Sequence, residues 1–275
     1  MLTDVLLPLF SDPEETPVQG LLQIAKLQAS FSRTVTLCGV ESDVPALANH
    51  WGARMASIPE MAQQVEQRSR DKIAQLLREA GSVLGEASYT TINIRASFTD
   101  PGDRVAQTAG NYDLTVLPLR AGSVAWREIA ESILFGSTRP VLLGPASEYP
   151  QRLDCVAIAW DGGAPAHRAV FDAMPLISQA SSVVVLVADE EKHISPDSAG
   201  ELIGYLRRHR VEAKLARLPA GQGKIGLDLQ HAAQAADAGL LVMGAYGHSR
   251  LREFVLGGAT ADVLGETMMP LFMSR

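Results

Sequence analysis

The sequence predicts an α/β protein built from two tandem domains, each with a five-stranded parallel sheet flanked by helices. Two observations lead to this prediction. Short apolar runs alternate with stretches of helical periodicity along the whole chain, which is typical of parallel sheets covered by helices on both faces. The same order of strands and helices also occurs twice in the 275 residues, on either side of a polar segment at 145–152 that contains two prolines. We therefore expect domains at residues 1–146 and 152–275.

In the first half, each element has a local signal. Pro17 suits the first turn of a helix, and residues 61–80 place apolar side chains at helical spacing, with Gly81 expected to end that helix. Ile92 and Ile94 alternate with polar residues, as in a strand with one wetter face. The expected strands are 5–10, 34–40, 89–96, 113–119 and 139–144, and the expected helices begin at 17 and cover 61–80, 101–109 and 124–135.

Residues 41–59 do not fit this alternation. They contain Pro45, Trp51 and Gly52 and show no clear periodicity. The segment is too long for an ordinary connection between two elements, so we expect it to be a lid or cover.

The second half repeats the order of the first. Residues 182–188 form a fully apolar run that predicts a buried strand, and 161–165 reads as a tight loop between a strand and a helix. The expected strands are 155–160, 182–188, 211–218, 240–243 and 270–273, and the expected helices are 166–179, 196–209, 224–236 and 251–265.

Composition excludes several classes of function. The net charge is −7 and the isoelectric point is near 5.4, so no basic face is available for nucleic acid or for an anionic membrane surface. No apolar run approaches the ~20 residues of a membrane span, and the first residues lack the basic start of a secretory signal. Cys38 and Cys155 lie in apolar runs and are expected to be buried free thiols. These features predict a cytoplasmic protein.

One glycine-rich stretch stands out at 240–260. An apolar strand at 240–243 is followed by Gly244 and Gly247, then by Gly257 and Gly258, with Thr260 just beyond. Glycine removes the Cβ that would keep a phosphate from the backbone N–H groups, and a strand, loop and helix start is the usual arrangement of such a site. The spacing is neither that of the dinucleotide fingerprint nor that of the P-loop.

This stretch resembles the glycine signature of the universal stress protein family: two glycines separated by two residues, nine more residues, then glycine and a hydroxyl residue. Gly244, Gly247 and Gly257 match it, whereas Gly258 stands where the family's nucleotide binders usually have Ser or Thr. The resemblance extends to Asp161-Gly162, which follows the first strand of the second half. It implies Rossmann-like domains of the adenine nucleotide alpha hydrolase-like type, with sheet order 3-2-1-4-5 and pairing through their fifth strands.

The resemblance also implies a binding site for ATP or AMP, with or without Mg²⁺, in the second half. Asp161 would face the nucleoside, Val187 would contact the adenine ring, and the glycine loop would hold the phosphates. The expected nucleotide-binding residues are Asp161, Gly162, Val187, Met243, Gly244, Gly247, His248, Arg250, Gly257, Gly258, Ala259 and Thr260.

Each of these residues also has a purely structural interpretation. The glycines could serve only tight turns, Asp161 could begin a turn or cap a helix, and Val187 could be an ordinary core residue. Thr260 could bind a phosphate or accept from an N–H in the first turn of its helix. His248 and Arg250 could neutralise phosphate charge or lie in a solvated loop.

The first half lacks this glycine pattern. Pro140 and Pro270 both open a last strand, which gives an offset of 130, and this offset places Gly258 on Glu128. Gly244 falls on Leu114 by that offset, or near Pro118 if the strand ends are aligned. Ser11 and Asp12 lie near the place of Asp161. We therefore expect the first half to have the same fold with a degenerate nucleotide site.

No catalytic set is recognisable. The sequence contains none of the common zinc-protease, serine-hydrolase or redox motifs, and the six histidines lack metal-ligand spacing, so we expect neither a metal site nor enzymatic activity beyond slow, incidental ATP hydrolysis. The predicted function is a stress-response regulator that binds an adenine nucleotide and forms a pseudo-dimer within one chain, with a protein partner or a further homodimer as additional expectations. Two alternatives are an interaction protein without a nucleotide and an ATP-splitting, adenylating enzyme.

Overall fold

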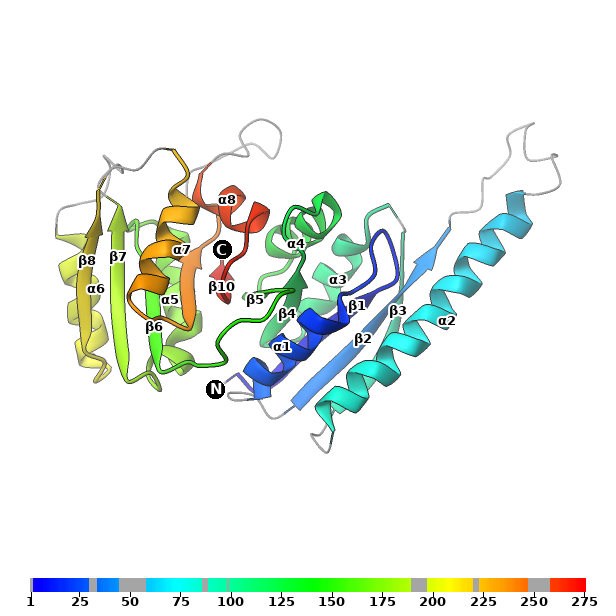
Figure 1. The fold of residues 1–275 in the computed structure, drawn as a ribbon, viewed down its shortest axis with the longest axis horizontal. Helices are drawn as coiled ribbons and strands as arrows, with labels where there is room; N and C mark the ends of the chain where they lie inside the picture. The colour runs from blue at the N-terminus through cyan, green and yellow to red at the C-terminus, as the bar shows by residue number, and fades with distance from the viewer. Residues whose placement is uncertain are drawn as a thin grey trace.

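The computed structural model describes residues 2–29, 34–44, 58–85, 89–97, 99–188, 197–219, 223–246 and 258–275. Strands and helices alternate through both halves of the chain (Figure 1). The strands are β1 (Asp4–Phe10), β2 (Thr34–Asp43), β3 (Tyr89–Ser97), β4 (Leu114–Leu119), β5 (Val141–Pro145), β6 (Cys155–Ala159), β7 (Ser182–Ala188), β8 (Ala213–Leu218), β9 (Leu240–Gly244) and β10 (Leu271–Ser274). The helices are α1 (Val18–Ala29), α2 (Ile58–Leu84), α3 (Pro101–Ala109), α4 (Val124–Gly136), α5 (Ala164–Ile177), α6 (Ser198–Arg208), α7 (Ile225–Ala235) and α8 (Ala259–Gly265).

All ten strands form one sheet in the order β3-β2-β1-β4-β5-β10-β9-β6-β7-β8. Each half therefore has the expected order 3-2-1-4-5, and every pair within a half is parallel. The halves meet through β5 and β10, which pair antiparallel with Leu142 opposite Phe272. The predicted fold class is confirmed, and the sequence offset of 130 relates these two central residues.

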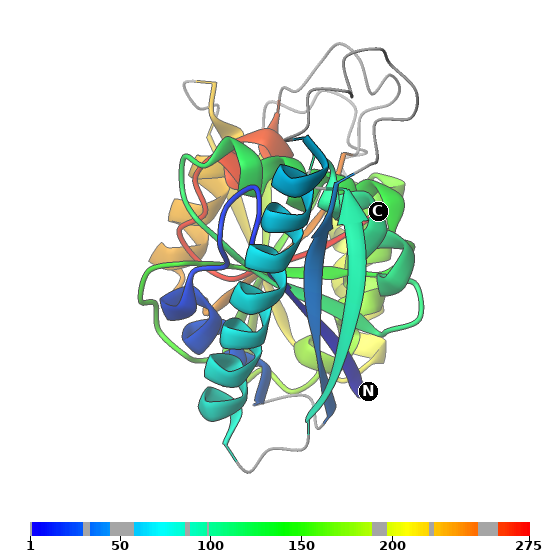
Figure 2. The same cartoon turned by 90° about the vertical axis from the view of Figure 1, so that its right-hand side faces the viewer.

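Helices cover both faces of the sheet. In each half the first two crossovers run one way along the sheet and the next two run back, and because crossovers are right-handed, the two pairs of helices lie on opposite faces. One core contains side chains of α3, α4, α7 and α8, and the cores on the opposite face contain side chains of α1, α2, α5 and α6. Figure 2 shows the long helix α2 lying along β2.

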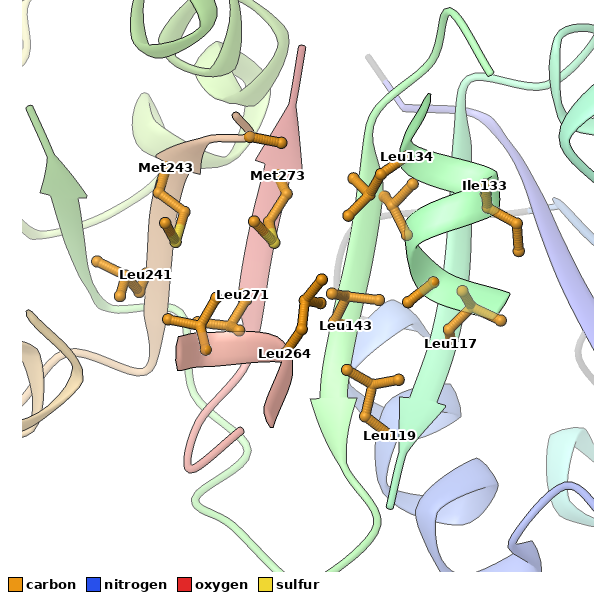
Figure 3. Close-up of a cluster of buried hydrophobic side chains, with 14 of the residues drawn as sticks. Leu117, Leu119, Ile133, Leu134, Leu143, Leu241, Met243, Leu264, Leu271 and Met273 are labelled. Carbon is orange, nitrogen blue, oxygen red and sulfur yellow. The ribbon is translucent and has the colours of Figure 1, made fainter. Parts of the chain in front are cut away.

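The first of these cores continues across the junction of the halves. Leu143 of β5 and Leu271 of β10 are fully buried in the same cluster, together with Leu264 of α8 and Leu134 of α4 (Figure 3). The backbone N–H of Gly122 also donates to the carbonyl of Gly265 across the junction (N···O 3.2 Å). Apolar burial and sheet pairing therefore join the two halves into one body.

The structure corrects three expected helix boundaries, and in one of these the last helix, α8, begins at Ala259 after the N-cap Gly258 rather than at 251. Gly81 does not end α2, which continues to Leu84; the glycine instead leaves room for the Tyr89 hydroxyl, which lies 2.4 Å from the place of a Cβ at Gly81. Helix α5 begins at Ala164 rather than at 166, since Gly163 already serves as its N-cap and Pro165 suits its first turn. The expected lid at 41–59 lies mostly outside the described residues, although 41–43 extend β2 and 58–59 belong to α2.

Two further expectations concern the thiols and membranes. Cys38 and Cys155 are both free and buried, as predicted. Burial raises the pKa of the Cys38 thiol from 9.0 to about 12. Among the described residues, none of the helices is both long and apolar enough to cross a bilayer.

Candidate functional site

The candidate site lies where β6 and β9 end side by side at the carboxyl edge of the second half. These strands are parallel neighbours, with Ile158 opposite Val242, so the residues that follow them leave the sheet together. In open parallel sheets this edge is the usual place for a ligand. The structure thus brings Asp161 and Gly244 to one edge, as the sequence predicted.

Asp161 begins the turn into α5. Its Oδ1 accepts the backbone N–H of Gly163 at 2.8 Å, and Gly162 has a φ of +70°, which favours glycine. The other carboxylate oxygen, Oδ2, makes no hydrogen bond to the described part of the chain, and the side chain is half-buried. Asp161 therefore has a structural role in the turn and still offers one acceptor at the edge.

Gly244 is needed for packing. A Cβ at this position would lie 2.5 Å from the backbone nitrogen of Ala166 and 2.6 Å from the carbonyl carbon of Pro165. The end of β9 therefore approaches the first turn of α5 more closely than any residue with a side chain would allow. This contact explains Gly244 without a ligand, as one of the structural interpretations proposed.

Thr260 has a partner that neither interpretation of the sequence foresaw. Its Oγ1 accepts the backbone N–H of Tyr246 at 3.1 Å, and its side chain is buried. It does not accept from the first turn of its own helix. Its hydroxyl instead ties the residue after β9 to the start of α8, and this correction reflects a contact between residues 14 positions apart.

Gly258 is the most open of the described loop residues. Its φ is +97°, in the region that glycine favours, and no atom of the described residues lies within 4 Å of the place where a Cβ would project. Gly258 is exposed and Ala259, the first residue of α8, is half-buried. The bare main chain at Gly258 is therefore accessible from solvent.

Val187 and Met243 are buried near the ends of their strands. Val187 packs in the core beneath α5 and α6 together with Trp160, and Met243 packs in the opposite core near the junction (Figure 3). Gly247, His248, Arg250 and Gly257 lie outside the described residues.

Tyr246 is a residue that the sequence reasoning missed. It has a φ of +57°, unusual for an aromatic residue, and its ring lies 4.2 Å from that of Phe135 on α4 in the first half. Burial, together with the nearby Glu131 carboxylate, raises the pKa of its hydroxyl. The chain just after β9 thus contacts the first half directly through Tyr246, and no local pattern in the sequence predicts this contact.

This chain resembles known proteins in sequence and in fold. No protein-family model matches the sequence. A universal stress protein of Synechocystis sp. is 23% identical over 217 residues, which cover 75% of this chain and 73% of that protein. The structure of a universal stress protein from Archaeoglobus fulgidus DSM 4304 aligns with a TM-score of 0.73 at 13% identity, covering 100% of this chain and 97% of that one. A functionally unknown protein from Pseudomonas aeruginosa PAO1 aligns with a TM-score of 0.56 at 15% identity, covering 99% and 92%.

The resemblance to tandem universal stress proteins is confirmed. The register of the sheet then allows the two universal-stress-protein-like halves to be superposed residue by residue. Thr115 pairs with Val141 and Leu241 pairs with Leu271, so the equivalent of Gly244 is Pro118, the second of the two expected alignments. Val5 pairs with Leu114 and Val156 with Leu240, which places Phe10 at the position of Asp161.

The corresponding edge of the first half is therefore built differently. Phe10 is fully buried and packs edge-on against Trp126 at 5.5 Å, so neither Ser11 nor Asp12 replaces Asp161. Ser11 and Asp12 instead join a hydrogen-bond network with Ser42 and Ser69, in which Asp12 Oδ2 accepts from both the Ser11 and Ser42 hydroxyls (2.9 and 2.8 Å). Polar groups of this edge thus bond to one another.

Glu14 adds a carboxylate to the first half's edge. Its Oε1 accepts the Ser123 hydroxyl at 2.9 Å, and Ser123 is the N-cap of α4, accepting from the N–H of Trp126 at 3.1 Å. An acidic group is favoured at a helix N-terminus. This helix N-terminus is therefore already supplied with an anion by the chain itself.

Among the described residues, no group of His, Cys, Asp and Glu could hold a metal ion. Trp126 and Trp160 are buried core residues, His167 is exposed, and His209 caps the end of α6. Trp51 and His193 lie outside the described residues.

Proposed function

We propose that this protein is a stress-response regulator whose second half binds an adenine nucleotide, ATP or AMP, and that it acts by binding rather than by catalysis. The contrast between the two edges supports the proposal most strongly. One edge has Asp161, whose Oδ2 is not hydrogen-bonded among the described residues, and Gly258 as the N-cap of α8, whereas the other has Phe10 in place of Asp161 and the Glu14 carboxylate at the N-cap of α4.

Asp161 and the main chain near Gly258 suit different parts of a nucleotide. The Asp161 carboxylate accepts hydrogen bonds from a ribose hydroxyl or an adenine amine through Oδ2. Main-chain N–H groups at the start of α8 donate to phosphate oxygens, since Gly258 is exposed and has no side chain of its own. If Mg²⁺ takes part, the phosphates supply ligands, because the described chain has no acidic cluster of its own there.

Tyr246 connects the candidate site to the first half of the chain. Its backbone N–H is held by Thr260 beside the glycine loop, and its ring packs on Phe135 of α4. A ligand that displaced the chain next to Tyr246 would alter this contact and so bias the position of α4. The regulatory step that we propose is this change in the contact between the halves.

Isothermal titration of ATP and AMP tests the proposal. Asp161→Asn keeps the acceptor for the Gly163 N–H but loses the charge, and Gly247→Val tests the glycine loop. Gly200→Ala is the matched control, because no atom lies within 4 Å of its added Cβ. We expect at least tenfold weaker binding in the first two variants and unchanged binding in the control. Absence of heat with the wild type, or equal affinities in all four proteins, would refute the proposal.

One observation favours a second candidate, an interaction protein that binds no nucleotide. Gly244 and Thr260 both have structural roles that need no ligand, as packing partner of α5 and as acceptor for Tyr246. Mass spectrometry of small molecules released from the purified, denatured protein separates the candidates. An adenine nucleotide in stoichiometric amount would exclude this second function.

A further inference from the structure

A cavity between α5 and α6 lies outside the candidate nucleotide site. Its volume is about 570 Å³, within the range of about 300–1,000 Å³ usual for small-molecule pockets. Neither Gly244, Gly258 nor Thr260 lines it. Its walls come from the first turns of both helices and from the residue that follows β6. The lining residues are Trp160, His167, Arg168, Val170, Phe171, Ser198, Glu201, Leu202 and Tyr205.

Three aromatic rings dominate the walls of this cavity. Trp160 is 4% exposed, and its indole N–H donates to the Ser198 hydroxyl at 3.0 Å, so this ring is fixed and its polar atom is satisfied. The Trp160 ring packs against that of His167, with 4.5 Å between the ring centroids. Phe171 is 66% exposed, so its ring is open to solvent. Tyr205 also lines the cavity, and the guanidinium of Arg208 already lies 5.9 Å from its ring centroid. The faces of such rings carry partial negative charge and attract cations.

The polar groups of the cavity point to the same ligand chemistry. Arg168 is neutralised, because its Nε lies 2.8 Å from Asp172 Oδ2, which also accepts the Ser274 hydroxyl. Glu201 is exposed and forms no ion pair with the described residues. His167 Nδ1 lies 2.9 Å from the carbonyl oxygen of Gly163 and must donate to it, so in the neutral ring Nε2 is an acceptor.

The cavity therefore offers the exposed ring of Phe171, the Glu201 carboxylate, which is unpaired among the described residues, and the imidazole acceptor of His167, while the guanidinium of Arg168 is already paired. We propose that it binds a small organic cation, an ammonium group carried on an aromatic or branched alkyl body. The ammonium lies near Glu201 and the aromatic faces, and the apolar body contacts Val170, Leu202 and Phe171. This site is independent of the nucleotide proposed above, although Trp160 directly precedes Asp161.

The structural alternative for Glu201 is that it only stabilises α6. It lies in the first turn of that helix, where an acidic side chain is favoured by the helix dipole. The two roles differ in what they predict. A helix-stabilising carboxylate affects the unfolding temperature, whereas a ligand-binding carboxylate affects the affinity for a cation and not for a neutral molecule of the same shape.

The test uses benzyltrimethylammonium and its neutral isostere neopentylbenzene as probes of the full-length protein, with binding followed by ligand-observed NMR at low salt. We compare wild type with Glu201→Gln and Phe171→Ala, both of which alter exposed side chains and should fold. Glu212→Gln is the control, since Glu212 is exposed and outside the cavity. Thermal unfolding of each variant is measured in parallel.

The proposal expects saturable binding of the cation by wild type and by Glu212→Gln. Glu201→Gln should weaken it about fivefold and Phe171→Ala about threefold, and added salt should weaken the wild-type complex. The neutral probe should respond to Phe171→Ala only. Absence of saturable binding by the wild type, or equal affinities of wild type and Glu201→Gln for the cation, would overturn it. Because no nucleotide is present, the result is separate from the proposed nucleotide binding.

Discussion

The connections that follow β4 and β9 are equivalent in the two halves and differ most between them. Residues 120–123 join β4 to α4 directly, whereas residues 245–258 join β9 to α8 by a connection more than three times as long. The short connection ends in the N-cap Ser123, which Glu14 contacts, and the long one carries the glycines. The same sheet arrangement thus occurs in both halves, and the two connections differ in the N-cap that they supply, which is Ser123 for α4 and Gly258 for α8.

A second difference concerns how the first helix of each half meets the central strand. In the first half, the helix supplies the small residue: a Cβ at Gly20 would lie 2.8 Å from Pro118 Cβ. In the second half, the strand supplies it, with Gly244 against Pro165 and Ala166. The close approach of helix and strand is a property of the fold, and the glycine that allows it can lie in either element. Gly244 alone is therefore weak evidence for a ligand.

The largest effect should come from adding a single methyl group at this contact. Gly244→Ala places a Cβ against the backbone of α5, so we expect a loss of about 2–3 kcal/mol in the free energy of unfolding. Gly20→Ala should cost a similar amount in the first half, and Gly200→Ala should cost nothing. Urea unfolding of the three variants checks this. If Gly244→Ala were as stable as wild type, the packing explanation would fail.

Removing the cap of α4 should have the next largest effect. Ser123→Ala deletes the acceptor of the Trp126 N–H and the donor to Glu14, which together should cost about 1–2 kcal/mol of stability. The control is Glu15→Gln, which removes an exposed ion pair with Lys72 (2.9 Å) and should cost less than about 0.5 kcal/mol. Equal midpoints of urea unfolding for the two variants would show that the Glu14–Ser123 contact does not stabilise the first half's edge.

The link between the halves can be measured by a double-mutant cycle. Tyr246→Ala and Phe135→Ala each remove one ring of the pair at 4.2 Å, and we expect a coupling of about 1 kcal/mol between them. The same cycle, repeated with saturating ATP, reports whether the ligand alters the contact. Strictly additive effects on the free energy of unfolding, with and without ATP, would contradict the proposal that a ligand acts on α4 through this contact.

The smallest expected effect is a pH dependence of the free energy of unfolding, which arises from Cys38 in the first half. The pKa of Cys38 is raised in the folded state, so its contribution to stability is complete below the unfolded pKa near 9.0 and is lost as pH rises toward about 12. Between pH 7 and 9.5 this loss is about 0.8 kcal/mol. Cys38→Ala should abolish that part of the decline in unfolding free energy. An identical pH profile in the variant would contradict the assignment.

Periodicity made much of the fold predictable. The bounds of β7 and α3 were predicted to the residue, because an apolar run and a proline-started helix are local signals. The sheet order followed from the family resemblance. Gly81 was misjudged because its environment is Tyr89 of the next strand, which the local pattern of α2 does not reveal.

The site was less predictable for the same reason. Asp161 and Gly244 were identified because they end strands that the sheet brings together. Glu14 contacts Ser123 and Tyr246 contacts Phe135 over more than 100 residues of chain, so neither contact has a signature in spacing or composition. For Thr260 the sequence left phosphate binding and a first-turn N–H as alternatives, whereas its hydroxyl accepts the backbone N–H of Tyr246, 14 residues earlier in the chain.

The antiparallel pair of β5 and β10 has a consequence for assembly. In two separate chains, pairing through such edge strands would depend on concentration and would be lost on dilution. Here the segment 146–154 links the two halves in one chain, and a short link holds the halves at an effective concentration of roughly millimolar. One half can therefore diverge in its chemistry while still covering the exposed edge of the other, however scarce the protein becomes in the cell.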